Sequence, residues 1–164
     1  MLLYPSPISN APRLSSQLLD IREHGDIHGI MAAPVCTVLS NAGAKHPRTD
    51  DELREALALV DACLRLAYVF RDTLKWWVIE NPVGKLNKWL GNPAMRFHPW
   101  HYGDPYTKLT QLWGEFNTDL PRNEVEPVEG SKMWKKYGGK SERTKELRSA
   151  TPPGFSQAFF EANP

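Results

Sequence analysis

Trp76-Trp77-Val78-Ile79-Glu80-Asn81-Pro82-Val83-Gly84 is the stretch that decides the fold, because in it an apolar run ends at a carboxylate and a turn. The four apolar residues 76–79 predict a buried strand. The Asn-Pro and Val-Gly pairs that follow are typical of a turn, so we expect the strand to end at Glu80. A carboxylate at the C-terminal end of a strand in an open α/β sheet lies where ligands bind. The alternative is that Glu80 caps a turn or forms an ion pair with Lys85.

A second predicted strand precedes this one and is joined to it by a long helix. Residues 26–34 form a short apolar stretch that runs into a loop at Cys36. A capping-box pattern opens the helix at residues 49–52, and apolar residues then recur at helical spacing as far as Lys75. A strand, helix and strand of this kind form a βαβ unit, whose right-handed crossover puts both strand ends on one edge of a parallel sheet. We therefore expect Cys36 and Glu80 to face one cleft.

The remaining segments predict shorter elements. Residues 85–93 indicate a short helix or loop, residues 95–102 and 110–114 indicate two aromatic-rich strands in a hairpin, and residues 155–163 indicate a final helix. Arg96, His98 and His101 alternate on the first of these strands. They would line the cleft, although a surface hairpin explains the same spacing. Trp76 and Trp77 fit a core or an interface better than a base-stacking platform.

The bulk properties indicate one domain and exclude several classes of protein. With 164 residues, the chain predicts an irregular N-terminal segment over residues 1–19 and a single domain over residues 20–164. A net charge of +1 does not decide whether the partner is a polyanion. No apolar run approaches the ~20 residues of a membrane span, and the N-terminus lacks the features of a signal peptide, so we expect a cytoplasmic protein with no membrane partner. Two cysteines are too few for a disulfide framework, no spacing resembles a zinc site, and Cys63 fits the core of the helix.

One segment carries a pattern found in proteins that bind nucleic acids. Residues 132–148 contain seven Lys and Arg side chains interleaved with Trp134 and Tyr137. A solvated surface loop is the more common meaning of such a charge run. Both interpretations stay open from the sequence.

A thiol and a carboxylate at one sheet edge permit a specific reaction. The thiolate adds to an electron-poor ring while the acid protonates or hydrogen-bonds the ring nitrogen, as addition to carbon 6 of a pyrimidine requires. On this chemistry and on four segments, the sequence resembles the cytosine-5 DNA methyltransferases, in particular the short methylase-like proteins of bacteriophages. Residues 26–36 look like the strand that leads to the family's Pro-Pro-Cys nucleophile, and residues 79–82 look like its Glu-Asn-Val strand end. Residues 102–114 are similar to its Tyr-Gly-x-Pro-Gln-Arg-Arg segment, and residues 148–155 are similar to its closing segment.

The resemblance covers residues 20–163 and implies an α/β fold with a mostly parallel sheet, helices on both faces, and a truncated Rossmann-like methyltransferase core. It implies DNA as partner, Cys36 as nucleophile and Glu80 as the residue that holds a base flipped out of the duplex. Lys108 stands in the family's basic position and is expected to contact phosphate or support the loop. Asn81 and Pro82 shape the turn that presents Glu80, and Arg96 completes the substrate-binding set.

Two departures from the family's pattern concern the nucleophile loop and the cofactor. Val35 replaces the second proline of Pro-Pro-Cys, which leaves the loop less constrained. The resemblance implies S-adenosylmethionine as cofactor, but only 35 residues precede Cys36 and they contain no Phe-x-Gly-x-Gly turn. We expect either a truncated relative or a pocket completed by a rebuilt N-terminus, a second copy of the chain or another subunit. The alternative is a non-catalytic DNA-binding or interaction protein that lost the cofactor half.

Overall fold

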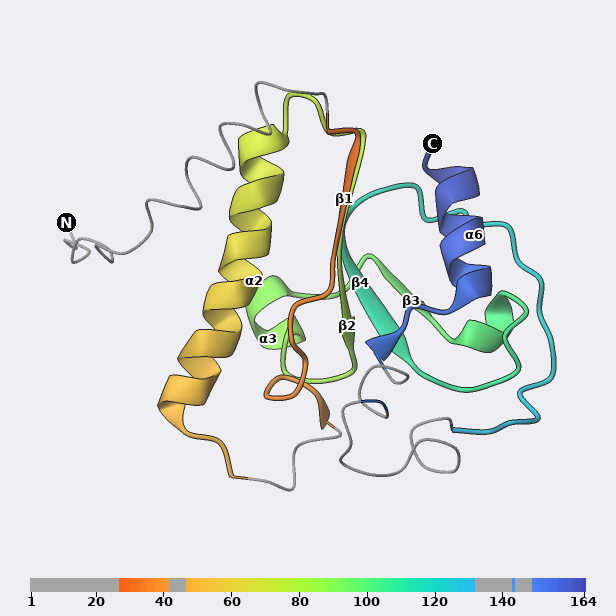
Figure 1. Ribbon diagram of the computed structural model, residues 1–164, viewed down its shortest axis with the longest axis horizontal. Helices are drawn as coiled ribbons and strands as arrows, with labels where there is room; N and C mark the ends of the chain where they lie inside the picture. The colour runs from red at the N-terminus through yellow and green to blue at the C-terminus, as the bar shows by residue number, and fades with distance from the viewer. Residues whose placement is uncertain (1–26, 42–46, 132–142, 144–148) are drawn as a thin grey trace.

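A computed structural model of the chain describes residues 27–41, 47–131, 143 and 149–164. Its helices and strands form three layers, with the long helix α2 on one face of a four-stranded sheet and the C-terminal helix α6 on the other (Figure 1). The elements in chain order are β1 (Gly29–Ala32), α2 (Asp50–Phe70), β2 (Trp76–Pro82), α3 (Asn87–Leu90), β3 (Met95–Phe97), the 3-10 turn η2 (Pro99–His101), β4 (Thr110–Glu115) and α6 (Pro153–Ala162).

The sheet is mixed, and the expected mostly parallel, Rossmann-like sheet is wrong. The strand order is β1-β2-β4-β3, and only β1 and β2 pair in parallel, while β4 runs antiparallel to both β2 and β3. The reason lies in the connection between β3 and β4. A parallel pairing needs a crossover that carries the chain back along the sheet, usually through a helix. Residues 98–109 hold only one 3-10 turn, so the chain re-enters the sheet from the edge where β3 ends.

The β1–α2–β2 unit has the predicted order and parallel pairing. Thr49 caps α2 with the expected box: its hydroxyl accepts from the Glu52 backbone N–H at 3.1 Å, and the Glu52 carboxylate accepts from the Thr49 N–H at 2.9 Å. The helix ends at Phe70, five residues before the predicted end, because the backbone N–H groups of Thr73 and Leu74 both turn back to the Phe70 carbonyl. The Lys75 N–H then donates to the His28 carbonyl at 2.7 Å, which brings the chain into the sheet.

β2 is longer than predicted, and β3 is shorter. β2 continues through Asn81 and Pro82, which lie opposite Gln111 and Thr110 of β4, so the predicted end at Glu80 is wrong. Proline is tolerated at this position because it is the last residue of the strand. The strand expected over residues 95–102 stops at Phe97, because Pro99 begins η2.

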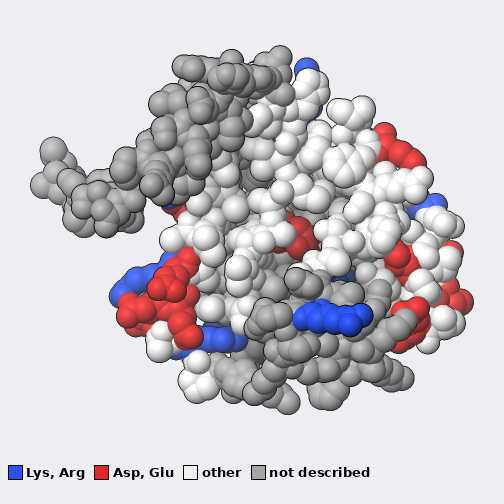
Figure 2. All heavy atoms as spheres, viewed as in Figure 1, with Lys and Arg blue, Asp and Glu red and all other residues white. Residues whose placement is uncertain are grey.

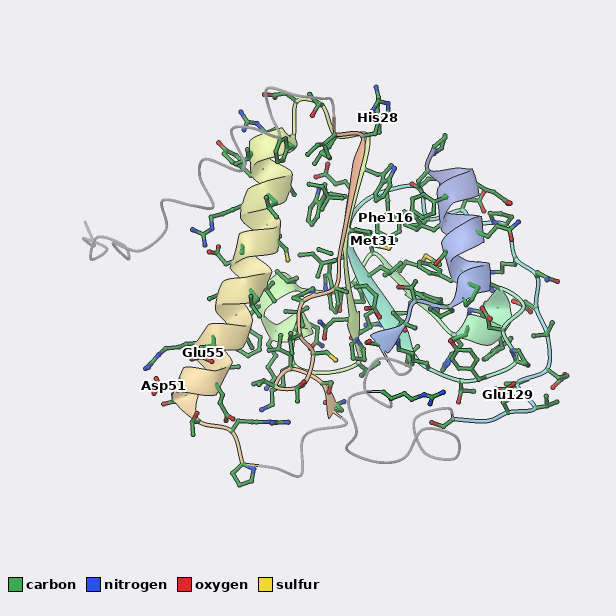
Figure 3. The ribbon with its side chains drawn as sticks, viewed as in Figure 1. His28, Met31, Asp51, Glu55, Phe116 and Glu129 are labelled. Atoms are coloured by element: carbon green, nitrogen blue, oxygen red, sulfur yellow. The ribbon has the colours of Figure 1, made fainter. Side chains whose placement is uncertain are left out.

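Both faces of β2 are covered, which explains why its sequence shows no polar alternation. Trp76 and Val78 belong to the core under α6, together with Phe155 and Phe159, both of which have no exposed surface. The alternate residues Trp77 and Ile79 pack on the other face, against α2. In Figure 3, the side chains of Met31 and Phe116 point into the layer between the sheet and α6, where both pack against the buried core.

Helix α6 is fastened at both ends by side chains from distant parts of the chain. At its start, the Gly154 N–H donates to the Asp104 carboxylate at 2.9 Å. Such a carboxylate at a helix N-terminus is favourable because it meets unpaired N–H groups and the positive end of the helix dipole. At its end, the Asn163 amide oxygen accepts from the Asn117 N–H at 2.7 Å. Within the part of the chain that the structure describes, no helix is long and apolar enough to cross a membrane.

The capping box of α2 gives a direct test of the fold. Thr49→Ala removes the acceptor for the Glu52 N–H, and we expect the free energy of unfolding to fall by about 1 kcal/mol. Chemical denaturation monitored by circular dichroism measures this change. Thr118→Ala, which changes an exposed threonine in the loop after β4, is the matched control. Equal stability of both variants would contradict the role of the cap.

Candidate functional site

Four chain segments that carry predicted site residues meet at one edge of the sheet. β1, β2 and β3 point in one direction and β4 in the other, so the ends of the first three strands and the start of β4 share an edge. Cys36 follows β1, Glu80 lies near the end of β2, and Lys108 lies two residues before β4. The correction from a mostly parallel to a mixed sheet therefore leaves the predicted common edge in place, because β4 enters the sheet there.

A side-chain hydrogen bond joins the loop that carries Cys36 to the strand that carries Glu80. The amide nitrogen of Asn81 donates to the carbonyl of Pro34 at 3.0 Å. Asn81 is almost fully buried, at 1% exposure, so this bond is protected from water. The bond joins Pro34, two residues before Cys36, to Asn81, one residue after Glu80. It therefore holds the two segments close together.

The loops after β1 and β2 are also joined through their backbones. The Asn41 N–H donates to the Val83 carbonyl at 2.9 Å, and the Lys85 N–H donates to the Leu39 carbonyl at 2.7 Å. A methyl group on Gly84 would lie 1.9 Å from that same Leu39 oxygen, so only glycine permits the approach. The Arg48 guanidinium adds a third connection, since it donates to the Thr37 carbonyl at 2.6 Å. The loop of Cys36 is thus held by the segment that follows β2 and by the segment that precedes α2.

Glu80 is a partly buried carboxyl group without a salt bridge. It lies opposite Leu112 on the sheet face that α6 covers. Burial raises the pKa of the Glu80 carboxyl above its ordinary value of 4.5, and the positive charge of Lys108 lowers that pKa in part. The four ion pairs found among the described residues all lie at the surface, and none of them includes Glu80 or Lys85. Glu80 therefore stays protonated to a higher pH than an exposed glutamate.

The other predicted site residues do not all face Glu80. Asn81, Gln111 and Arg96 are register partners across β2, β4 and β3, so their side chains share the opposite sheet face from Glu80. Asn81 is thus a positioning residue, and Arg96 is an exposed residue on the far face. Pro82 lies opposite Thr110 at the end of β2.

The two histidines form a compact cluster instead of alternating on a strand. The His98 N–H donates to Nδ1 of His101 at 3.4 Å, and the rings of Trp100 and His101 meet edge to face at 4.1 Å between centroids. Burial lowers the pKa of both imidazoles. His98 directly follows β3 and so lies at the edge that also holds Glu80.

Sequence reasoning missed two buried polar contributors. Gln111 is 3% exposed, and its amide oxygen has no partner among the described residues; the same is true of the amide oxygen of Asn81. The feature of the sequence that could have revealed Gln111 is its position as a polar residue inside the apolar run of β4. Asp104, which anchors Gly154, left no local signal, because its partner lies 50 residues away.

The predicted basic segment is largely outside the described residues. Of its seven basic side chains only Arg143 is described, and it is exposed. Lys85, Lys88 and Trp89 are exposed in the segment after β2, near the edge that carries Glu80. Figure 2 shows acidic and basic side chains intermixed on the visible face, without one continuous basic surface. DNA binding therefore stays a prediction.

Two further findings concern metal binding and similarity to known proteins. Across residues 27–41, 47–131, 143 and 149–164, no group of three or more His, Cys, Asp or Glu side chains is arranged to hold a metal ion. No protein-family model matches the sequence, and none of the curated proteins is detectably similar to it. The resemblance to cytosine-5 methyltransferases consequently stays a hypothesis.

The cavity that the structure describes lies away from Glu80, so it does not place a methyl donor beside that residue. A cavity of about 330 Å³ lies at the opposite edge of the sheet, where Trp77 and Glu115 form part of its wall. Trp77 and Glu80 are three strand residues apart, which is ~10 Å along β2. A methyl donor in that cavity would not reach a base held at Glu80. The chain also lacks the Phe-x-Gly-x-Gly turn that cradles the cofactor in the family.

Titration of Glu80 tests its environment directly. We expect the pKa of the Glu80 carboxyl, followed by carbon-detected NMR of the side chain, to lie above 4.5 because the charged form is desolvated. Lys108→Gln removes the opposing positive charge and should raise this pKa further. Lys88→Gln changes an exposed lysine near the same edge and serves as the control. A pKa below 4.5 in the wild type would contradict the assigned environment.

Stability measured against pH gives an independent test of the same carboxyl. Because folding raises the pKa of Glu80, the wild type has its full stability below the unfolded-state pKa and loses part of it as pH rises through the folded-state pKa. Glu80→Gln does not titrate, so its free energy of unfolding relative to wild type should increase from pH 4 to pH 7. Urea denaturation at both pH values measures the difference, with Glu115→Gln on β4 reporting the same substitution at an exposed position. A decrease over this range would show that Glu80 has a stabilising cationic partner.

Proposed function

We propose that this chain is a DNA cytosine-5 methyltransferase-like protein that holds a flipped-out pyrimidine between Cys36 and Glu80. The observation that carries the proposal is the hydrogen bond from Asn81 to the Pro34 carbonyl, because it ties the thiol-bearing loop to the strand of the carboxyl group. The raised pKa of Glu80 supports it further, since a protonated carboxyl can donate to a ring nitrogen.

The proposed reaction uses water, the base and two side chains. The Cys36 thiolate forms a bond to C6 of cytosine, and Glu80 transfers its proton to N3, so that the electron pair of the C5–C6 double bond becomes available at C5. C5 then takes a proton from water. In the reverse steps C5 loses a proton, the sulfur–C6 bond breaks, and N3 returns its proton to Glu80. The net result is exchange of the C5 hydrogen with solvent.

The position of Lys108 fits a duplex with one base extruded. Both reacting groups lie at the sheet edge, and a stacked base would keep C6 out of their reach, so the base has to leave the helix. Lys108 lies two residues before β4 and interacts electrostatically with Glu80. A phosphate beside Lys108 would offset its charge. The exposed Lys85, Lys88 and Trp89 supply further positive charge and one aromatic surface for the flanking strand.

A second candidate function is DNA binding without chemistry. The observation that favours it is that the 330 Å³ cavity lies at the other end of β2 from Glu80. A methyl donor bound in that cavity would not reach a base held at Glu80. In that case the chain recognises an extruded base through the Glu80 carboxyl, and the Cys36 thiol forms no bond to the base. The two candidate functions differ in whether the Cys36 thiol forms a covalent bond to the base.

Hydrogen exchange at C5 separates the two candidates without any cofactor. The full-length protein is incubated in D₂O with duplexes that present cytosine in varied contexts or opposite an abasic site, which makes flipping easier. We expect deuterium at C5, measured by mass spectrometry after nucleoside digestion. Cys36→Ser should abolish exchange, and Glu80→Gln should slow it by about 10²–10⁴-fold, the usual contribution of a general acid.

Controls and outcomes follow from the two roles. Cys63→Ser changes the other thiol, which packs with the core on the α2 face, and should leave exchange unchanged. Exchange that persists in Cys36→Ser contradicts the enzymatic proposal. DNA binding that is retained in Cys36→Ser and lost in Glu80→Gln, with no exchange in the wild type, supports the binding protein instead.

A further inference from the structure

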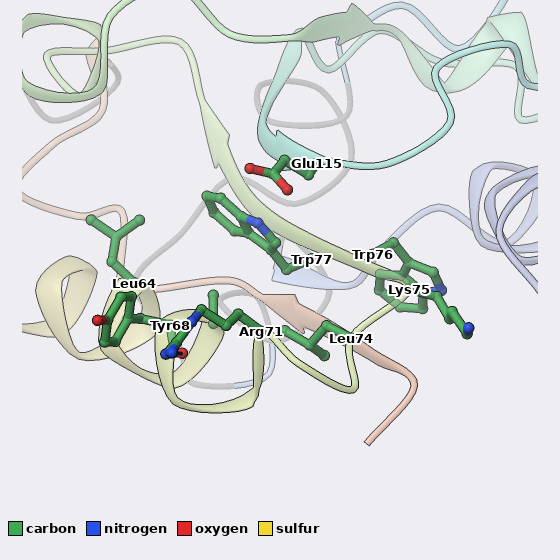
Figure 4. A pocket seen from close by; sticks show the side chains of 9 residues that line it. Leu64, Tyr68, Arg71, Leu74, Lys75, Trp76, Trp77 and Glu115 are labelled. Atoms are coloured by element: carbon green, nitrogen blue, oxygen red, sulfur yellow. Dashed lines mark hydrogen bonds between the residues drawn. The ribbon is translucent and has the colours of Figure 1, made fainter. Parts of the chain in front are cut away.

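A second site lies at the opposite end of β2 from Glu80. The cavity of about 330 Å³ opens between the last turns of α2, the segment that follows it, the start of β2 and the end of β4 (Figure 4). Its walls combine aromatic, cationic and acidic side chains, contributed mainly by Leu64, Tyr68, Arg71, Lys75, Trp77 and Glu115. No role in the thiol chemistry involves these residues.

The aromatic wall of the cavity is the Trp77 indole. Trp77 is only partly buried, although it lies in the middle layer of the fold and packs against the core on the α2 side. In Figure 4, the Trp77 ring lies between the Glu115 carboxylate and the paired side chains of Tyr68 and Arg71. A planar ring laid on the indole would therefore meet an acid at one end and a base at the other.

Arg71 is held in position before any ligand arrives. Its guanidinium lies over the Tyr68 ring, with 4.3 Å from the central carbon to the ring centroid. One of its nitrogens donates to the Tyr68 carbonyl at 2.9 Å, at the end of α2. The Arg71 Nε also lies 3.7 Å from the Asp72 carboxylate, in an exposed ion pair. A guanidinium has five N–H donors, so these contacts still leave donors for an anion, and a fixed geometry lowers the entropy lost on binding. Lys75 also lines the cavity, but in Figure 4 its side chain extends past Trp76 and away from Arg71.

Glu115 supplies the complementary group. It is the register partner of Trp77 on the neighbouring strand, so both side chains stand on the same face of the sheet. An ionised carboxylate only accepts hydrogen bonds, and it selects a ring edge that presents two adjacent N–H donors. Guanine has such an edge, with N1–H beside its amino group. Adenine presents an unprotonated ring nitrogen there, which a carboxylate repels.

We propose that this cavity binds a guanine nucleoside phosphate, with the base stacked on Trp77, its N–H edge on Glu115 and its phosphate on Arg71. The ligand is either a free nucleotide or a nucleotide of a single strand, because both offer the same base and phosphate. The site does not depend on Cys36 or Glu80, and its failure would leave the proposed function intact.

Calorimetry on the full chain tests the site with GMP, AMP, guanosine and inorganic phosphate as probes. We expect GMP to bind at least 10-fold more tightly than AMP and than guanosine. Arg71→Gln should weaken GMP binding at least 10-fold and leave guanosine unchanged, and Glu115→Gln should remove the preference for GMP over AMP. Both positions are exposed, so the variants should fold, which a thermal melt verifies. Arg65→Gln, on the same helix but paired with Asp61 away from the cavity, is the matched control.

Further outcomes identify the source of the ligand and decide whether the proposal stands. A guanine-containing single-stranded pentanucleotide that binds more tightly than GMP identifies the ligand as a strand, and the opposite order identifies a free nucleotide. Either order of affinities supports the site when Arg71→Gln weakens binding of the tighter ligand and Cys36→Ser leaves that binding unchanged. No heat of binding with GMP at millimolar concentration, or binding that neither Arg71→Gln nor Glu115→Gln changes, overturns it.

Discussion

The hydrogen bond from the Asn81 amide to the Pro34 carbonyl is the contact on which the arrangement of the proposed site depends. A loop that leaves a strand has few constraints of its own, and the loop of Cys36 has a valine where a second proline would stiffen it. A buried side chain from the neighbouring strand supplies the missing constraint. A hydrogen bond of this kind is effective because its partners cannot exchange it for water. The position of Cys36 thus depends on β2 as well as on the turn in which the Cys36 carbonyl accepts from the Leu39 and Ser40 N–H groups.

β2 also determines how the two proposed sites are separated. Its apolar residues lie in the buried cores on both faces of the sheet, and the two proposed sites lie at its two ends. At its C-terminal end lie Glu80 and the loop of Cys36, and at its N-terminal end lie Trp77 and the cavity beside α2. Because both ends belong to one rigid strand, a ligand at either end meets preformed groups. The fold therefore keeps the two proposed sites apart within a single domain.

The sequence was sufficient for features that depend on local patterns. The capping box at Thr49, the parallel pairing of β1 and β2 and the final helix all followed from periodicity and chirality. The direction of β4 was not predictable from its own residues, because an apolar run pairs equally well in either direction. The same holds for Arg96, which falls on the far face only because β3 adopts one particular register with Gln111. Contacts such as Asp104 with Gly154 join residues far apart in the chain, and no local pattern encodes them.

The burial of the Glu80 carboxyl bears on the proposed function. Among the described residues Glu80 has no salt bridge, and burial disfavours its charged form more than Lys108 favours it, so ionisation at higher pH lowers the stability of the folded chain. A neutral glutamine of the same shape does not carry this cost. The unfavourable environment is relieved when a ligand presents a basic ring nitrogen, because the proton of Glu80 is then shared instead of lost to water. Cytosine N3 is such an acceptor. A ligand that shares the proton of Glu80 would keep this carboxyl uncharged without exposing it to water, and this is the physical reason for proposing that a base binds there.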